Sequence, residues 1–132
     1  MEPDAFGLAL GTGVLGGVLV LFGLAGSHLM TAAEDVGVRA ASEAFADRNY
    51  MPDGTLVSRR RADAQITDTQ EAVRRAVRLV LDGRVRCVDG TDIPIRAETI
   101  CIHGDGPHAA DFARALRSAF EAEGIAVRAP QG

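Results

Sequence analysis

Apolar positions along the chain form short runs that alternate with amphipathic stretches. Residues 18–22 are a β-branched and apolar run between two glycines, a pattern typical of a strand buried on both faces. Residues 38–46 and 99–102 predict two further strands, and residues 125–127 predict a short last one. Because strand, loop and helix recur in that order, the sequence predicts an α/β fold with a mainly parallel sheet.

A short helix and a hairpin are predicted from local signals. The helix follows Ser27 as its N-cap and ends at Gly37, and its apolar side is formed by Leu29, Met30 and Ala33. The hairpin joins residues 85–88 to residues 93–95 through the Asp89-Gly90 turn. Pro94 keeps the second arm of this hairpin away from a central position in a sheet.

Two longer helices are predicted by apolar residues at 3.6-residue spacing. One begins with a capping box of Asp68 and Glu71 and ends at Gly83. Its expected buried stripe consists of Val73, Ala76, Val77 and Val80. The other spans about residues 108–123, and its expected buried face consists of Ala109, Phe112, Ala113, Leu116, Ala119 and Phe120.

The first part of the chain allows two interpretations. Residues 5–33 contain no charged side chain, so a hydropathy window predicts a membrane-spanning helix there. Against this, glycine is frequent in the stretch, and no basic residue precedes Arg39. We therefore favour a buried strand and expect no membrane partner. Residues 1–17 predict no clear element and are treated as a poorly defined start, with residues 18–132 as the folded unit.

Composition narrows the class of protein. The chain is 47% hydrophobic and 24% charged with a formal net charge of −4, which is ordinary for a globular domain. All 14 basic residues are Arg, and the only basic run is Arg59-Arg60-Arg61, so a nucleic-acid partner is not expected. Two cysteines are too few for a disulfide framework, which favours a reducing, cytoplasmic compartment.

Ionisable residues follow two of the predicted strands, where parallel α/β folds place their functional groups. His103 and Asp105 leave one strand in a glycine-rich turn before Pro107, and the helix start could favour an anion. A His can exchange protons near neutral pH, and an Asp can act as a base. The alternative is that Asp105 caps the helix and His103 makes a local hydrogen bond.

The second cluster spans residues 43–50. Glu43 lies among Ala and Phe, where an unpaired charge is costly, while Asp47 and Arg48 could be a solvated ion pair. The arginines at 59–61 could be a solvated patch, or one could grip a carboxylate or phosphate. His28, His103 and His108 match no known metal-ligand spacing, so we assign no metal site.

Two strings in these clusters are specific. Residues 43–50 read E-x-F-A-D-R-x-Y and residues 101–107 read C-x-H-G-D-x-P. In this order the strings resemble the LamB/YcsF family, and the resemblance runs over about residues 18–130. Members of that family act as the A subunit of the prokaryotic ATP-dependent 5-oxoprolinase. The resemblance implies a distorted β/α barrel related to the glycoside hydrolase/deacetylase-like barrels.

The resemblance also implies an activity and a set of site residues. The reaction is cleavage of 5-oxo-L-proline to L-glutamate with ATP hydrolysis, in a complex with the B and C subunits of 5-oxoprolinase. The residues expected at the barrel mouth are Glu43, Asp47, Arg48, Tyr50, Arg59, His103 and Asp105. We assign His103, Asp105 and Glu43 to catalysis, with Glu43 holding an arginine in place. We assign substrate binding to Asp47, Arg48, Tyr50 and Arg59. Arg48 or Arg59 is expected to bind the 5-oxoproline carboxylate or a phosphate.

The sequence departs from the family pattern in its first part. The acidic D-x-N-x-D-x-G-E string and the histidine-bearing strings that open the family pattern are absent. We therefore expect the C-terminal half of a family member, an incomplete barrel whose open edges favour self-association and which is inactive alone. The competing hypotheses are a non-catalytic scaffold that contacts the B and C subunits, and a small membrane-anchored protein.

Overall fold

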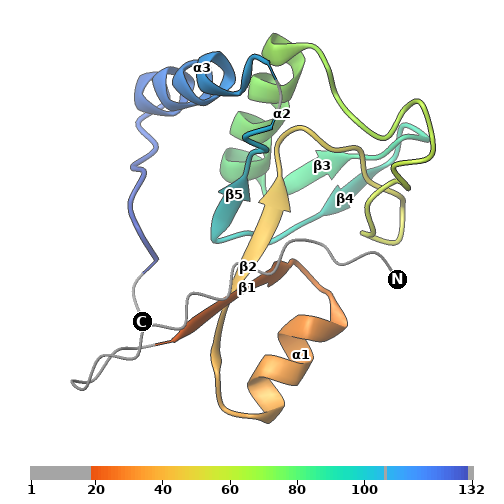
Figure 1. Ribbon diagram of the computed structural model, residues 1–132, viewed down its shortest axis with the longest axis vertical. Helices are drawn as coiled ribbons and strands as arrows, with labels where there is room; N and C mark the ends of the chain where they lie inside the picture. The colour runs from red at the N-terminus through yellow and green to blue at the C-terminus, as the bar shows by residue number, and fades with distance from the viewer. Residues whose placement is uncertain (1–18, 106, 131–132) are drawn as a thin grey trace.

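The sheet has three parallel strands. The computed structural model describes residues 19–105 and 107–130. The strands are β1 (Val20–Leu24), β2 (Arg39–Phe45) and β5 (Thr99–Cys101), and β2 lies between the other two (Figure 1). The parallel α/β class predicted from the sequence is confirmed. Since strands that run in parallel end at the same edge, the residues that follow β2 and β5 are brought together.

Helix α1 (His28–Asp35) connects β1 to β2 and lies below the sheet in Figure 1. It approaches β1 closely at Gly23, where an added Cβ would come 3.0 Å from the sulfur of Met30. The chain then turns at Gly37, whose φ of +72° is the left-handed conformation that glycine adopts without strain. The helix is confirmed, although the Ser27 side chain makes no capping hydrogen bond.

The long connection from β2 to β5 contains a helix and a hairpin. In α2 (Thr69–Asp82), the Asp68 side chain accepts the Glu71 amide, and Gly83 closes the helix with φ 63°. Strands β3 (Arg84–Arg86) and β4 (Asp92–Pro94) then pair antiparallel. The last helix, α3 (Ala109–Ala122), packs against α2 at the top of Figure 1. The predicted hairpin, the two longer helices and the Asp68 cap are all confirmed.

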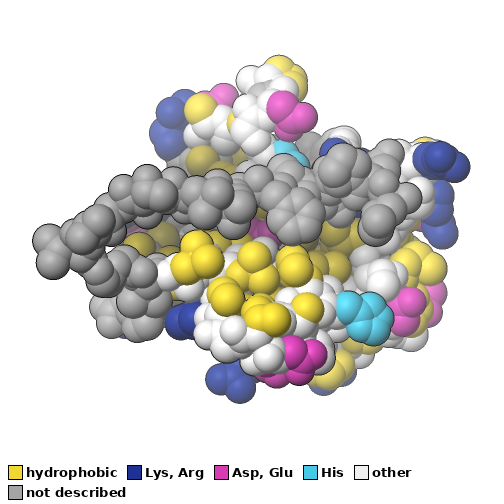
Figure 2. Space-filling model, turned by 60° about the horizontal axis from the view of Figure 1, so that its bottom comes forward, with side chains coloured by type: hydrophobic (Ala, Val, Ile, Leu, Met, Phe, Trp, Pro, Cys, Tyr) yellow, Lys and Arg dark blue, Asp and Glu magenta, His cyan; other side chains and the backbone are white. Residues whose placement is uncertain are grey.

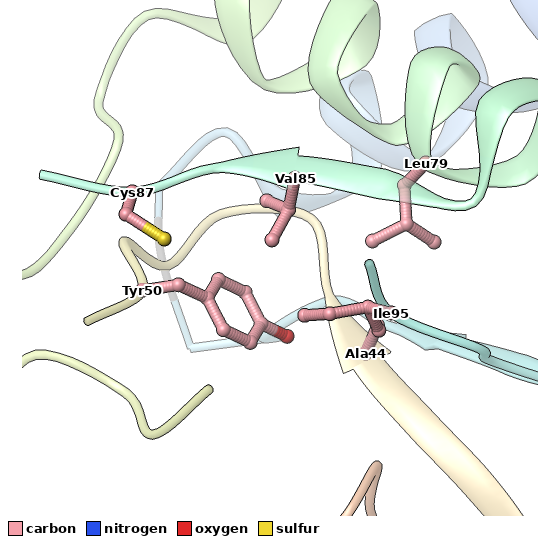
Figure 3. Packing of buried hydrophobic residues seen from close by; sticks show 6 residues of the cluster. All are labelled: Ala44, Tyr50, Leu79, Val85, Cys87 and Ile95. Carbon is pink, nitrogen blue, oxygen red and sulfur yellow. The ribbon is translucent and has the colours of Figure 1, made fainter. Parts of the chain in front are cut away.

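Two hydrophobic clusters hold these elements together. In the first, the Tyr50 ring lies between β2, α2 and the hairpin, among Ala44, Leu79, Val85, Cys87 and Ile95 (Figure 3). The second joins α2 and α3 to the end of β2, through Ala46, Ala72, Ala76, Phe112, Leu116 and Phe120. Both clusters use side chains from the carboxyl end of β2, Ala44 in the first and Ala46 in the second, so that end packs against both.

Three expectations about burial and strands were wrong. Strand β1 is not buried on both faces, because Phe22 keeps 47% of its surface exposed. In α2, Val80 is 39% exposed, and Leu79 is buried instead, because the helix faces the hairpin on one side and α3 on the other. Residues 125–127 form no strand; the Ile125 amide donates to the Phe120 carbonyl and finishes the helix.

The described part of residues 5–33 is not one continuous helix, since it contains β1 and the start of α1. Among residues 19–105 and 107–130, no helix is both long and apolar enough to cross a membrane. The expectation for residues 1–17 lies outside the described residues.

Candidate functional site

The end of β2 separates polar from apolar side chains by simple alternation. Ala44 and Ala46 are buried at 0% and 4% exposure and pack into the two clusters. Successive residues of a strand point to opposite faces, so Glu43 and Phe45 share the other face. Asp47 lies in the bend just beyond the strand, and its carboxylate meets the same imidazole, that of His103, as the Phe45 ring does. The sequence therefore sets two carboxyl groups and an aromatic ring on one side of β2.

His103, two residues after β5, meets that side of β2. Its Nδ1 lies 2.9 Å and 3.1 Å from the two carboxylate oxygens of Asp47. Its ring stacks on Phe45, with 5.7 Å between centroids and 20° between planes. A carboxylate can only accept, so Nδ1–H is the donor and Nε2 is left to hold the lone pair of the neutral ring. The imidazole is thus fixed in one orientation with Nε2 turned away from Asp47.

Arg59 reaches the other ring nitrogen. Its Nη2 lies 3.4 Å from Nε2 of His103, a long contact in which the guanidinium is the donor. The loop that carries Arg59 is folded back on the end of β2, because the Ile66 amide donates to the Asp47 carbonyl and the Asn49 amide donates to the Ala64 carbonyl. An anionic group that binds the exposed Arg59 would therefore lie beside His103.

Glu43 is the second carboxyl group near His103. Burial raises its pKa above the ordinary value for Glu, and the positive charge that nearby His103 carries when it is protonated acts in the opposite direction. A carboxyl with a raised pKa can hold or release a proton closer to neutral pH than an exposed Glu does. The site therefore combines one imidazole, two carboxyl groups of different surroundings and one exposed guanidinium, which together can transfer protons beside an anion.

Arg48 and Tyr50 lie inside the protein and not at an open mouth. Arg48 is 4% exposed, and its Nη2 donates to the Val57 carbonyl at 2.8 Å. Tyr50 is 0% exposed, and its hydroxyl accepts the Phe45 amide at 2.9 Å. The structure thus places these two side chains beneath the site, where neither can reach a bound molecule without rearrangement of the loop.

Asp105 does not join the cluster. Its side chain is exposed, and it has no hydrogen-bond or ion-pair partner among residues 19–105 and 107–130. The helix that follows begins at Ala109 with His108 as its N-cap, and not at Pro107, because residues 107 and 108 form a turn. His103 pairs with Asp47, 56 positions away in the chain, and not with its near neighbour.

No metal-binding cluster of three or more His, Cys, Asp or Glu side chains occurs within the described ranges. Cys101, at the end of β5, is a free thiol close to the site. Burial, with the nearby carboxyl groups of Glu43 and Asp47, raises its pKa to about 11. The thiol therefore stays protonated near neutral pH and is a poor nucleophile.

Sequence reasoning identified His103, Asp47, Glu43 and Arg59 as candidates but missed Phe45, whose ring supports the imidazole. The signal was present in the period-2 alternation of Glu43, Phe45 and Asp47, which puts all three on one side of β2. The partner of His103 could not be read in the same way, because it depends on which strands become neighbours.

Comparisons with known proteins identify the family. A family model described as the LamB/YcsF family matches residues 13–132. The chain is 52% identical over 111 residues to the 5-oxoprolinase A subunit of Bacillus licheniformis, covering 84% of this chain and 44% of that protein. It is 54% identical over 110 residues to the 5-oxoprolinase A subunit of Paracidovorax citrulli, covering 83% and 44% respectively.

A solved structure shows the same fold. The crystal structure of the lactam utilization protein from Thermus thermophilus superposes with a TM-score of 0.79 at 43% identity, covering 85% of this chain and 44% of that one. The chain thus spans less than half the length of the relatives that it matches. The family model covers all of the described residues, and the chain belongs to the LamB/YcsF family.

Proposed function

We propose that this chain supplies part of the site of a 5-oxoprolinase A subunit, which opens 5-oxo-L-proline to L-glutamate with hydrolysis of ATP. The observation that carries the proposal is the pairing of His103 with Asp47 at the ends of β5 and β2. It occurs in a chain that is 52% identical to a protein named as a 5-oxoprolinase A subunit. The name of the Thermus relative, a lactam utilization protein, fits a cyclic amide as substrate.

In the proposed reaction, His103 transfers protons. The lactam C–N bond breaks, the hydroxyl of water ends on the carbonyl carbon, and a proton ends on the nitrogen that becomes the amine of glutamate. Nε2 can take the proton from water and return it to the leaving nitrogen, while Asp47 holds Nδ1–H and stabilises the charged ring. Glu43, with its raised pKa, is a second group that can exchange a proton there.

Arg59 is the proposed anion-binding group. Its guanidinium is exposed and lies against His103, so a carboxylate of 5-oxoproline or a phosphate oxygen could pair with it next to Nε2. ATP enters as a substrate, since opening an unstrained lactam is unfavourable without coupling. Its γ-phosphoryl group passes to the lactam oxygen and activates the carbonyl carbon, water then adds and the C–N bond breaks, and a second water releases the phosphate to leave glutamate. Asp105, exposed two residues after His103, is a candidate for contact with a bound molecule.

The rest of the site is proposed to come from polypeptide beyond this sequence. The chain matches 44% of the length of its relatives, and its three parallel strands would form one part of a β/α barrel. We propose that the reaction requires the B and C subunits, since the relatives are named as one subunit of the enzyme, and that this chain alone releases no glutamate. The outer edges of β1 and β5, which pair with no further strand among residues 19–105 and 107–130, would favour association of the chain with itself or with the remaining part of the barrel.

The test is release of glutamate from 5-oxoproline and ATP by a complete relative assembled with its B and C subunits. Replacement by Ala of the histidine aligned with His103 should lower the rate by about 10²–10⁴-fold, the usual contribution of a general acid–base group. The matched control replaces the residue aligned with the exposed His28. An unchanged rate in the first variant would remove His103 from the mechanism and, if the subunits still assemble, would favour the scaffold hypothesis.

A further inference from the structure

The backbone amide of Phe45 lies where β2 extends past the end of β1. The last residue pair between these strands is Leu24 with Glu43, and the Ala25 amide still donates to the Glu43 carbonyl at 2.9 Å. Backbone groups two residues apart on a strand point to the same edge. The Phe45 N–H therefore points to the edge that β1 has left, where no strand of the described sheet can accept it.

The Tyr50 hydroxyl takes the place of the missing strand. Its oxygen accepts the Phe45 amide at 2.9 Å. Burial raises the pKa of Tyr50 to about 12, so the hydroxyl stays neutral across the physiological range. A part-buried amide left without an acceptor is costly, so this hydroxyl helps to hold the end of β2 in its position.

Tyr50 is itself held firmly. Its ring is fully buried beside Val85 and Ile95 (Figure 3). Its carbonyl accepts the Val88 amide at 3.0 Å, which ties it to the segment after β3. Because both the backbone and the ring of Tyr50 are held in place, its hydroxyl can restrain the strand that it contacts.

The other side of Phe45 carries the candidate site. Its ring stacks on the imidazole of His103, and Asp47, two residues further on, binds Nδ1 of the same ring. A shift of Phe45 would therefore move the surface against which His103 rests and the strand end that leads to Asp47. The contacts run without a gap from the core, through Tyr50 and Phe45, to His103.

We propose that Tyr50 is a positioning residue, whose hydroxyl fixes Phe45 and thereby sets the orientation of His103 against Asp47. This role differs from the substrate contact that the family resemblance implies for Tyr50, because the side chain is enclosed by the core. The inference deepens the proposed function by naming what orients His103. It rests on geometry within this chain, so it can be tested without turnover and can fail independently of the proposed reaction.

The test uses NMR spectra of the imidazole groups in the full chain, which has three histidines. Tyr50→Phe removes the hydroxyl and keeps the ring. The chemical shifts of the His103 ring protons should then move away from the values that stacking on Phe45 gives them. The signal of the hydrogen-bonded Nδ1–H should weaken. The signals of His28 and His108 should stay in place and show that the chain is folded. Ile95→Val, in the same cluster but away from the Phe45 amide, is the matched control and should leave His103 unchanged.

Two further measurements keep the test decisive if Tyr50→Phe does not fold. In the unaltered chain, the Phe45 amide should exchange slowly with solvent, as a bonded amide does. Phe45→Leu keeps the Tyr50 bond and removes the stacked ring, so it should change the His103 signals in the same direction as Tyr50→Phe. Fast exchange at Phe45, or His103 signals that stay unchanged in either variant, would overturn the proposal.

Discussion

The two flanks of β2 are built differently. Around its carboxyl end, Ala44, Tyr50 and Val57 have no exposed surface, and the backbone is tied to the loop that follows. On the other flank, Phe22 of β1 is 47% exposed and Val36 after α1 is 74% exposed. Hydrophobic side chains gather on the lower face of the molecule, where α1 lies in Figure 1 (Figure 2).

The contrast shows which flank of β2 carries the candidate site. The candidate site grows from the packed flank, where Phe45, Asp47 and His103 are fixed by neighbours inside the chain. The flank of β1 and α1 supplies a sheet neighbour for β2 but leaves apolar surface open. Substitutions on the packed flank should therefore change stability and the site together, whereas substitutions of exposed side chains on the β1 flank, such as Phe22, should change neither greatly.

The largest expected effect comes from emptying the packed flank. Tyr50→Ala removes a fully buried ring and the acceptor of the Phe45 amide, and should lower the free energy of unfolding by about 3–5 kcal/mol. Phe22→Ala, on the exposed side of β1, should cost about 1 kcal/mol or less. Urea unfolding followed by circular dichroism measures both. Equal losses in the two variants would remove the distinction between the flanks.

Arg48 gives a second comparison, between a buried and an exposed arginine. Arg48→Met removes a guanidinium that is 4% exposed and donates to the Val57 carbonyl, so it should cost about 1.5–3 kcal/mol. Arg60→Met removes an exposed guanidinium from the same loop and is the matched control, with an expected effect within about 0.5 kcal/mol. Urea unfolding of both variants decides, and an Arg60→Met loss as large as that of Arg48→Met would contradict a structural role for Arg48.

A smaller, pH-dependent effect is expected on the hairpin. The guanidinium groups of Arg78 and Arg86 hydrogen-bond to the Asp92 carboxylate and hold its pKa well below the usual range. Because the pKa of Asp92 is lower in the folded chain than in the unfolded chain, its ionised carboxylate stabilises the fold at pH values above the unfolded pKa of about 3.9. This contribution is lost as the pH falls. Asp92→Asn should therefore be less stable at pH 7, and the difference should shrink below about pH 4.

Asp111→Asn is the control for this change, since Asp111 forms a highly exposed ion pair with Arg114 on α3. Unfolding curves at a series of pH values compare the two variants. If Asp92→Asn and Asp111→Asn show the same dependence on pH, the Arg78–Asp92–Arg86 cluster contributes no more than a surface pair.

The contribution of Glu43 to stability should depend on pH in the opposite direction to that of Asp92, and it should be the smallest of these effects. Burial raises its pKa from 4.5, so the folded chain binds a proton more tightly than the unfolded chain does. Stability from this group is therefore present at low pH and falls as the pH rises above that value. Glu43→Gln should remove the fall and gain stability relative to the unaltered chain toward neutral pH. Glu34→Gln, exposed on α1, is the control, and a fall that persists in Glu43→Gln would contradict the assignment.

Local signals in the sequence predicted the elements well, because their causes are local. The Asp68 cap and the stop at Gly83 depend on a few adjacent residues, and both occur as predicted. The expectations that failed depend on neighbours far along the chain. The exposure of Phe22 depends on what covers β1, and the rotation of α2, which exposes Val80, depends on the hairpin and α3 together.

The candidate site also has features that the local sequence predicts and features that depend on residues far along the chain. The candidates His103, Asp47 and Glu43 could be found because polar residues at strand ends are a local pattern. The distance of 2.9 Å between His103 and Asp47 could not, because it requires β5 to lie beside β2. The burial of Arg48 and Tyr50 follows from the fold of the loop at residues 51–66, whose irregular sequence carries no periodic signal.

The most direct test of the pairing between His103 and Asp47 is a double-mutant cycle in a complete relative assembled with its B and C subunits. The positions aligned with Asp47 and His103 are changed to Asn and Gln, singly and together, and glutamate release from 5-oxoproline and ATP is followed. If the pair acts as one unit, the double variant loses little more rate than the worse single variant. Losses that multiply, or a single variant with an unchanged rate, would contradict a shared role of the two side chains.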